Sequence, residues 1–172
     1  MRMLVVLCAV LLAGCTGKPD NISPVADFDS TRYLGKWYEI ARMDHSFERG
    51  LSNVTAEYSM REDGKIKVLN RGYDAAKKEW KEAEGKATFV ESPKVGYLKV
   101  SFFGPFYGSY IVYELDRANY SHSLVSGPNK DYMWLLSRTP TMDPATKKRL
   151  LDKAQALGFD TSKLIHVTHE AR

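Results

Sequence analysis

The stretch Asn53–Arg71, NVTAEYSMREDGKIKVLNR, alternates apolar and polar side chains on both sides of an Asp63-Gly64 pair. A period of two places successive side chains on opposite faces of a β-strand. An Asp-Gly pair between two such runs is typical of a β-hairpin, because glycine readily adopts the positive φ of a tight turn. We therefore predict two antiparallel strands here, each with one apolar face.

The same alternation continues on both sides of this hairpin. Six further candidate strands are Trp37–Met43, Glu79–Val90, Gly96–Phe103, Ser109–Leu115, Ser121–Val125 and Tyr132–Ser137. The connections between them are short, and consecutive strands joined in this way pair as antiparallel neighbours. Eight such strands can remove their exposed edges by closing. The sequence predicts an all-β fold, an eight-stranded antiparallel up-and-down barrel.

One segment near the C-terminus has helical rather than alternating periodicity. Asp143-Pro144 is typical of an N-cap followed by proline at the first helical position. Apolar residues then recur at helical spacing, and Gly158 is suited to the C-terminal end of the helix; they are Leu150, Leu151, Ala154 and Leu157. We expect one C-terminal α-helix packed on the outside of the barrel, with a short strand at Leu164–Val167 after it.

The N-terminus has the pattern of a targeting segment. Met1-Arg2 is followed by the uncharged run MLVVLCAVLLAG at 3–14, which is too short to span a bilayer as a helix. Leu12-Ala13-Gly14-Cys15 resembles the lipobox of bacterial lipoproteins, which implies cleavage before Cys15 and acylation of its sulfur; the alternative is an ordinary signal peptide that carries a cysteine. We expect a lipoprotein signal peptide at 1–14, a lipidated tether at 15–27 with no capacity for a packed core, and the barrel domain at 28–172.

Composition adds constraints on partners and location. The 172 residues carry a net charge of +4, which gives no reason to expect nucleic acid as a partner. Of the two cysteines, Cys8 would leave with the signal peptide and Cys15 would carry lipid, so no disulfide is expected. Thr16 and Gly17 lack the aspartate that resembles an inner-membrane retention signal. The expected location is therefore the outer membrane, with the protein anchored by lipid and facing the periplasm.

Three short motifs occur in order along the predicted barrel. Gly35-Lys36-Trp37 opens the first strand, Asp131-Tyr132 precedes the penultimate strand, and Ser137-Arg138 ends that strand just before the helix. Together they resemble the three signature regions of the lipocalins, and the resemblance extends over 33–167. Trp37–Gly50 and Lys99–Gly108 are particularly similar to the bacterial outer-membrane lipocalins.

Gly35, Trp37 and Arg138 are expected to serve the fold rather than the ligand. Trp37 would plug the closed end of the barrel, with the guanidinium of Arg138 over its indole ring. Arg138 can also donate to backbone carbonyls near the start of the first strand. Lipocalins with different ligands share these positions, which agrees with a structural role.

The ligand is expected inside the barrel, since eight strands enclose room for one small molecule. Alternation counted from Trp37 nominates the inward side chains Ala41, Ala56, Tyr58, Ile66, Val68, Leu98, Val100, Phe102, Tyr113, Tyr132 and Trp134. Each could serve as plain core packing, but together they describe an apolar cavity with a few phenol hydroxyls. Tyrosines or Arg42 near the mouth could meet a headgroup.

The resemblance implies fatty acids or lysophospholipids as ligands, storage or transport of lipid in envelope maintenance under stress, and a homodimer. Two alternatives stay open: a carrier of a rigid hydrophobic molecule such as a tetrapyrrole or isoprenoid, and a lipid-modifying enzyme with the lipocalin fold.

Catalysis has little support in the sequence. No nucleophile elbow, zinc-binding helix motif or phosphate-binding loop is present, and we expect neither cofactor nor metal. The four histidines, His45, His122, His166 and His169, are scattered and are expected on the surface or in loops. Glu39 is expected to be a hydrogen-bonding residue near the closed end.

Two surface features allow more than one interpretation. The basic run Lys147–Arg149 fits the solvated face of the helix or, as a weaker alternative, an anionic membrane surface. The aromatic segment Phe102–Gly108 is either a packed hairpin corner or an apolar patch for a partner or a membrane.

Overall fold

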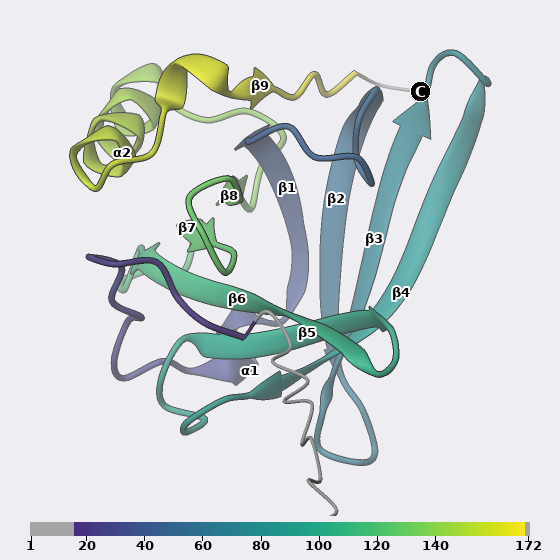
Figure 1. The fold of residues 1–172 in the computed structure, drawn as a ribbon. Coiled ribbons are helices and arrows are strands. Elements are labelled where there is room, and N and C mark those ends of the chain that lie inside the picture. Colours follow the sequence, from purple (N-terminus) through teal and green to yellow (C-terminus); the bar gives the residue numbers. More distant parts are fainter. Residues whose placement is uncertain (1–15, 171–172) are drawn as a thin grey trace, which may run out of the picture.

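Nine strands of residues 16–170, the part of the chain that the computed structural model describes, form one antiparallel sheet (Figure 1). They are β1 (Gly35–Arg42), β2 (Leu51–Met60), β3 (Ile66–Asp74), β4 (Glu79–Phe89), β5 (Tyr97–Phe103), β6 (Phe106–Leu115), β7 (His122–Ser126), β8 (Met133–Ser137) and β9 (Ile165–His166). The sheet closes because β1 pairs with both β2 and β8. β9 adds to β1 beyond the closed barrel. The predicted eight-stranded barrel and the short ninth strand are confirmed.

The hairpin predicted around Asp63-Gly64 is formed by β2 and β3. Tyr58 lies opposite Val68, and their side chains share the inner face. In the turn the Arg61 N–H donates to the Lys65 carbonyl oxygen at 2.8 Å, and Gly64 has a φ of 78°. The Asp-Gly pair therefore allows β2 and β3 to reverse direction within a few residues.

Within 16–170 the sheet is accompanied by two α-helices and one 3-10 turn: α1 (Ser30–Tyr33), α2 (Pro144–Ala156) and η1 (Thr161–Lys163). Asp143 caps α2 by accepting the Thr146 N–H at 2.9 Å, as the sequence predicts. Leu150 and Ala154 are fully buried against the outside of the barrel. No helix among residues 16–170 combines the length and apolar character that crossing a membrane requires.

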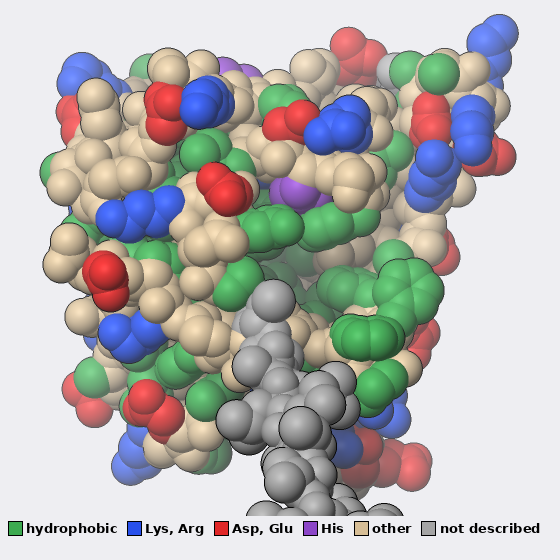
Figure 2. Space-filling model, in the orientation of Figure 1, with side chains coloured by type: hydrophobic (Ala, Val, Ile, Leu, Met, Phe, Trp, Pro, Cys, Tyr) green, Lys and Arg blue, Asp and Glu red, His purple; other side chains and the backbone are tan. Residues whose placement is uncertain are grey.

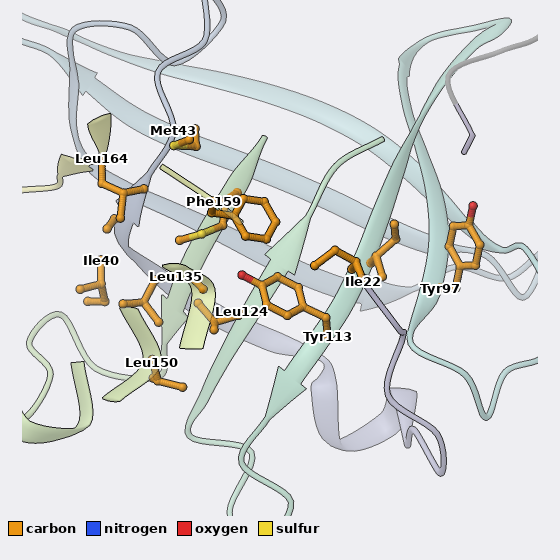
Figure 3. Close-up of a cluster of buried hydrophobic side chains, with 14 residues drawn as sticks. Ile22, Ile40, Met43, Tyr97, Tyr113, Leu124, Leu135, Leu150, Phe159 and Leu164 are labelled. Carbon is orange, nitrogen blue, oxygen red and sulfur yellow. The ribbon is translucent and has the colours of Figure 1, made fainter. Parts of the chain in front are cut away.

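The barrel wall separates two apolar clusters. The interior cluster lies within the barrel and includes Trp37, Tyr58 and Val68. The outer cluster lies between the barrel wall and the segments that cover it, and includes Ile40, Leu135 and Leu150 (Figure 3). Part of the wall is therefore apolar on both of its faces.

The segment 16–27 differs from the tether that we expected, because it packs on the outside of the barrel. Ile22 is 1% exposed and belongs to the outer cluster. The Val25 N–H donates to the Val112 carbonyl oxygen at 2.9 Å, and the Ser109 hydroxyl donates to the Gly17 carbonyl oxygen at 2.5 Å. Burial of Ile22, packing of Val25 and these hydrogen bonds hold a polar, proline-containing segment against β5 and β6.

Candidate ligand-binding site

The closed end of the barrel carries α1 and the Trp37–Arg138 pair. The Arg138 guanidinium carbon lies 3.9 Å from the centroid of the Trp37 ring. Its three nitrogens donate to the carbonyl oxygens of Tyr120, Lys36 and Arg32 at 3.1, 3.0 and 2.7 Å. Arg138 therefore ties the end of β8 to the start of β1, the structural role that the sequence predicts for it.

Gly35 is required at this end for two reasons. Its φ of 94° lies in the left-handed region, where a residue with a side chain would be strained. A Cβ there would also lie 3.3 Å from Nη1 of Arg138. Glycine thus allows the guanidinium to approach the backbone where β1 begins.

Above Trp37 the interior is apolar. Of the predicted inward residues, the interior cluster includes, or has packed against it, Ala56, Tyr58, Ile66, Val68, Leu98, Val100, Phe102 and Trp134. A cavity of about 10 Å³ remains between several of these side chains and α1, space for about one water molecule. The closed half of the barrel is therefore nearly filled. Figure 2 shows a hollow in this face of the molecule, bordered by hydrophobic side chains and a histidine.

Three buried tyrosines form a chain of hydroxyl groups within the interior. The Tyr110 hydroxyl lies 2.8 Å from that of Tyr33 and 2.8 Å from that of Tyr58, and Tyr33 also lies 3.2 Å from the Ser123 hydroxyl. Burial raises the pKa of Tyr33 to about 12 and raises the pKa of Tyr58 and Tyr110 as well. These phenols stay protonated at neutral pH and can each donate a hydrogen bond. Sequence analysis missed Tyr33 and Tyr110, although Tyr110 and Val112 continue the alternation of β6 on its inner face.

A buried polar network lies farther from the closed end. Arg42 Nη1 donates to Glu39 Oε1 at 2.8 Å, and Arg42 Nη2 donates to the Glu48 carbonyl oxygen at 2.8 Å. Trp134 Nε1 donates to Glu48 Oε2 at 3.1 Å, and His45 Nε2 lies 2.7 Å from the same oxygen. Glu39, Arg42, His45 and Glu48 are all buried. This network connects β1 and β8 to the loop at 43–50.

The electrostatics of the network favour a neutral Glu39. Burial is the largest cause, because it disfavours the charged carboxylate, and the negative charge of Glu48 adds to it. Arg42 opposes both, but the pKa of Glu39 is still raised well above its ordinary value. The surroundings of Glu39 therefore disfavour its ionisation, although Arg42 donates to it.

Aromatic rings surround the network at the open end of the barrel. The rings of His45 and Phe47 stack with centroids 3.7 Å apart. Tyr132 and Trp134 lie 6.1 and 5.4 Å from the His45 ring. The loop at 43–50 and the loop between β7 and β8 thus meet at the mouth. Asp131 lies in the latter loop, where its N–H donates to Asn129 Oδ1 at 2.9 Å.

Two of the predicted inward residues face outward. Ala41 lies opposite Leu135 in the outer cluster, and Tyr113 stacks on Phe159 with ring centroids 5.6 Å apart (Figure 3). In both strands the pairing register shifts just at this place, between Glu39 and Ala41 and between Val112 and Glu114. A β-bulge inserts one residue and reverses which side chains face inward beyond it. The expectation that Ala41 and Tyr113 line the interior was therefore wrong.

Two titratable residues also differ from expectation. Glu39 does point inward, but it belongs to the network with Arg42 and Glu48 rather than to the closed end. His45 lies in a loop as expected, yet it is only 6% exposed. Its burial could not be read from the sequence because residues of three segments create it. Among residues 16–170, no three His, Cys, Asp or Glu side chains come together as metal ligands.

A closed antiparallel barrel with an apolar interior, one sealed end and one open end defines a class of small-ligand binding proteins. The family model for the lipocalin-like domain matches residues 28–169, and the chain belongs to that family. The fold and the family support a protein that binds a small hydrophobic ligand.

Similar proteins cover nearly the whole chain. The outer membrane lipoprotein Blc of Vibrio cholerae is 61% identical over 168 residues, 98% of each chain. The protein of that name in Escherichia coli strain K12 is 50% identical over 173 residues, 97% of each chain. Among solved structures, insecticyanin of Manduca sexta has a TM-score of 0.71 at 22% identity, covering 90% of this chain and 87% of its own. The last similarity bears on the fold alone.

Proposed function

We propose that the protein is a membrane-anchored carrier that binds a single-chain lipid, a fatty acid or lysophospholipid, for storage or transport in the cell envelope. The observation that carries this proposal is the division of the barrel interior by polarity. The half next to α1 is lined by apolar side chains and by tyrosine hydroxyls that bond to one another, whereas the charged Glu39–Arg42–Glu48 network lies toward the mouth. An amphiphile with one tail and one polar head matches this division.

The energetics favour an acyl chain as the buried part. Each apolar Å² removed from water contributes about 25 cal/mol, which can exceed the cost of immobilising a flexible chain. The polar network supplies donors and acceptors for the head without placing an unpaired charge in the apolar half. Because the closed half is nearly filled, we expect the tail to enter from the mouth and to displace side chains such as Phe102.

The proposed location is the outer membrane, with Cys15 as the lipid anchor and the barrel facing the periplasm. The lipobox-like stretch 12–15 and the similarity to the outer membrane lipoproteins Blc support it. One acyl chain holds a protein only marginally, so several chains on Cys15 are expected. Cys15→Ser should abolish palmitate labelling and membrane retention; labelling that persists would place the anchor elsewhere.

Competition against a bound fluorescent fatty acid tests the ligand. We expect saturable displacement by lysophospholipid at micromolar concentration or below. Val100→Gln, which puts a polar amide on the interior wall, should weaken binding about tenfold. Val90→Gln is the matched control, because Val90 is 39% exposed and follows the end of β4 outside the apolar interior. Absence of displacement at any soluble concentration would exclude the lipid assignment.

We propose a carrier role without catalysis. The competition assay separates it from a carrier of a rigid ligand, and measurement of lipid turnover separates it from an enzyme. A rigid tetrapyrrole or isoprenoid would displace the probe where lysophospholipid does not. A lipid-modifying enzyme would consume lipid with turnover that depends on Glu39, the buried carboxyl with a raised pKa. A homodimer is expected from the resemblance, and sedimentation of the purified protein tests it.

A further inference from the structure

We propose that the open end of the barrel docks on the lipid surface that holds the anchor, through the apolar side chains Phe103 and Phe106 at the tip of the β5–β6 hairpin. This inference rests on acylation of Cys15, which is part of the proposed function. It assigns a role to the aromatic segment Phe102–Gly108, for which the sequence left two interpretations open.

The course of the segment 16–27 fixes where the anchor is attached. Its residue Val25 pairs with Val112, and farther toward the N-terminus Gly17 accepts the Ser109 hydroxyl. Because β6 runs from Phe106 at its open end to Leu115, the step from Val112 to Ser109 leads toward the hairpin tip. The Thr16 carbonyl oxygen accepts the Tyr97 hydroxyl, so the chain is held on the barrel up to the residue bonded to Cys15.

The distance between this point and the hairpin tip is small on the scale of a membrane. Ser109, the partner of Gly17, is three strand residues or about 10 Å from Phe106, and Tyr97, the partner of Thr16, pairs with Ile111, which is five residues or about 17 Å from Phe106. A lipid attached one residue before Thr16 therefore enters the bilayer beside the open end of the barrel. The opposite end, with α1 and Trp37, would be held away from the same surface.

The side chains at the tip suit a lipid surface. Phe103 is 80% exposed and Phe106 is 72% exposed, whereas Phe102 beside them packs against the interior cluster. Exposure of this extent contradicts a fully packed hairpin corner. Aromatic rings exposed together on a narrow tip mark an interaction site rather than scattered surface residues.

The distribution of exposed apolar side chains favours the open end as well. Among the described residues, the three most exposed large hydrophobic side chains are Phe103, Phe106 and Phe47, at 80%, 72% and 61%. Phe47 lies in the loop between β1 and β2, which is also at the open end. A membrane would thus cover these three side chains, and a ligand could pass between mouth and bilayer without crossing water.

Depth measurements on the full-length lipidated protein test the orientation. In vesicles of phosphatidylethanolamine and phosphatidylglycerol, Phe106→Cys carries an environment-sensitive fluorophore on its thiol. The matched control is Lys94→Cys, an exposed position in the turn between β4 and β5 at the closed end. We expect blue-shifted emission and several-fold stronger quenching by spin-labelled lipid at position 106 than at position 94. Equal quenching at both positions would overturn the proposal.

Transfer kinetics provide a second measurement that does not depend on the labels. The double variant Phe103→Ser/Phe106→Ser should slow transfer of a fluorescent fatty acid from protein to vesicles about tenfold, because two apolar membrane contacts are lost. Met60→Ser/Val90→Ser removes exposed apolar side chains at the closed end and should leave the rate unchanged. Equal slowing in both variants would contradict docking through the tip.

The outcomes separate this inference from the proposed function. Blue-shifted emission from the label at position 106 in detergent, without vesicles, in a protein that sediments as a dimer would show that a second copy covers the tip. That result would overturn membrane docking. A protein that binds no fatty acid but still buries position 106 in the vesicle would refute the ligand assignment and leave the docking intact.

Discussion

Glu39 is the residue whose ionisation we expect to control the pH dependence of stability. Its pKa in the folded protein is raised well above 4.5 by burial and by Glu48. The folded state therefore holds this proton more tightly than the unfolded state, and stability is lost as pH rises from about 4.5 through the folded pKa. Glu39→Gln should remove this loss, so the variant gains more stability at about pH 8 than at about pH 5.

Urea unfolding across this pH range measures the effect on the free energy of unfolding. Glu57→Gln, an exposed position on β2, is the control and should follow the wild-type profile. If the unfolding free energy of Glu39→Gln changed with pH in parallel with that of the wild type, Glu39 would ionise in the folded state as it does in the unfolded chain, and the account of its pKa would be wrong.

Tyr110 is the residue at the centre of the hydroxyl chain. Tyr110→Phe removes the partner of both Tyr33 and Tyr58 while keeping the ring. Leaving a buried hydroxyl unsatisfied costs about 1–3 kcal/mol, and Tyr33 keeps its contact with Ser123, so we expect a loss of about 2 kcal/mol in unfolding free energy. Tyr107→Phe, a half-buried position on the same strand, serves as the control. Equal losses of unfolding free energy in the two variants would refute a stabilising role for the chain of tyrosine hydroxyls.

Among the elements, α2 depends on its N-cap. Asp143→Ala removes the acceptor of the Thr146 N–H and should cost about 1 kcal/mol of stability. Asp152→Ala, which removes an exposed ion pair with Lys148 on the same helix, should cost less than about 0.5 kcal/mol. Thermal unfolding followed by circular dichroism compares the two, and an equal loss would contradict the capping argument.

The elements could be predicted from the sequence, but the inward-facing residues only in part. Alternation locates the eight strands of the barrel, and it gives the correct face where one side of the wall meets water, as at Tyr58 and Val68. It fails where the outer cluster covers the other side, because consecutive residues such as Ile40 and Ala41 are then both buried. The bulges near Ala41 and Tyr113 lie in such regions, so no change in hydropathy marks the reversal.

At the scale of the whole molecule, the unpredicted features arise from contacts between segments far apart in the chain. Ile22 is buried only because β5 and β6 offer an apolar outer face, and His45 only because Trp134 and Tyr132 lie beside it. The closed end, by contrast, follows from the local motif around Gly35 and Trp37 together with Arg138. The sequence therefore predicts the fold and the closed end of the barrel well, and the polar network at the mouth poorly.

The central claim is that the barrel holds one single-chain lipid with its tail in the apolar half. Native mass spectrometry of the full-length protein purified from its own membranes tests it most directly. We predict, beyond the mass of the acylated chain, one bound fatty acid or lysophospholipid per barrel, and its occupancy should fall in Val100→Gln and not in Val90→Gln. A bound tetrapyrrole or isoprenoid, or a barrel that carries no lipid in the wild-type protein, would contradict the account.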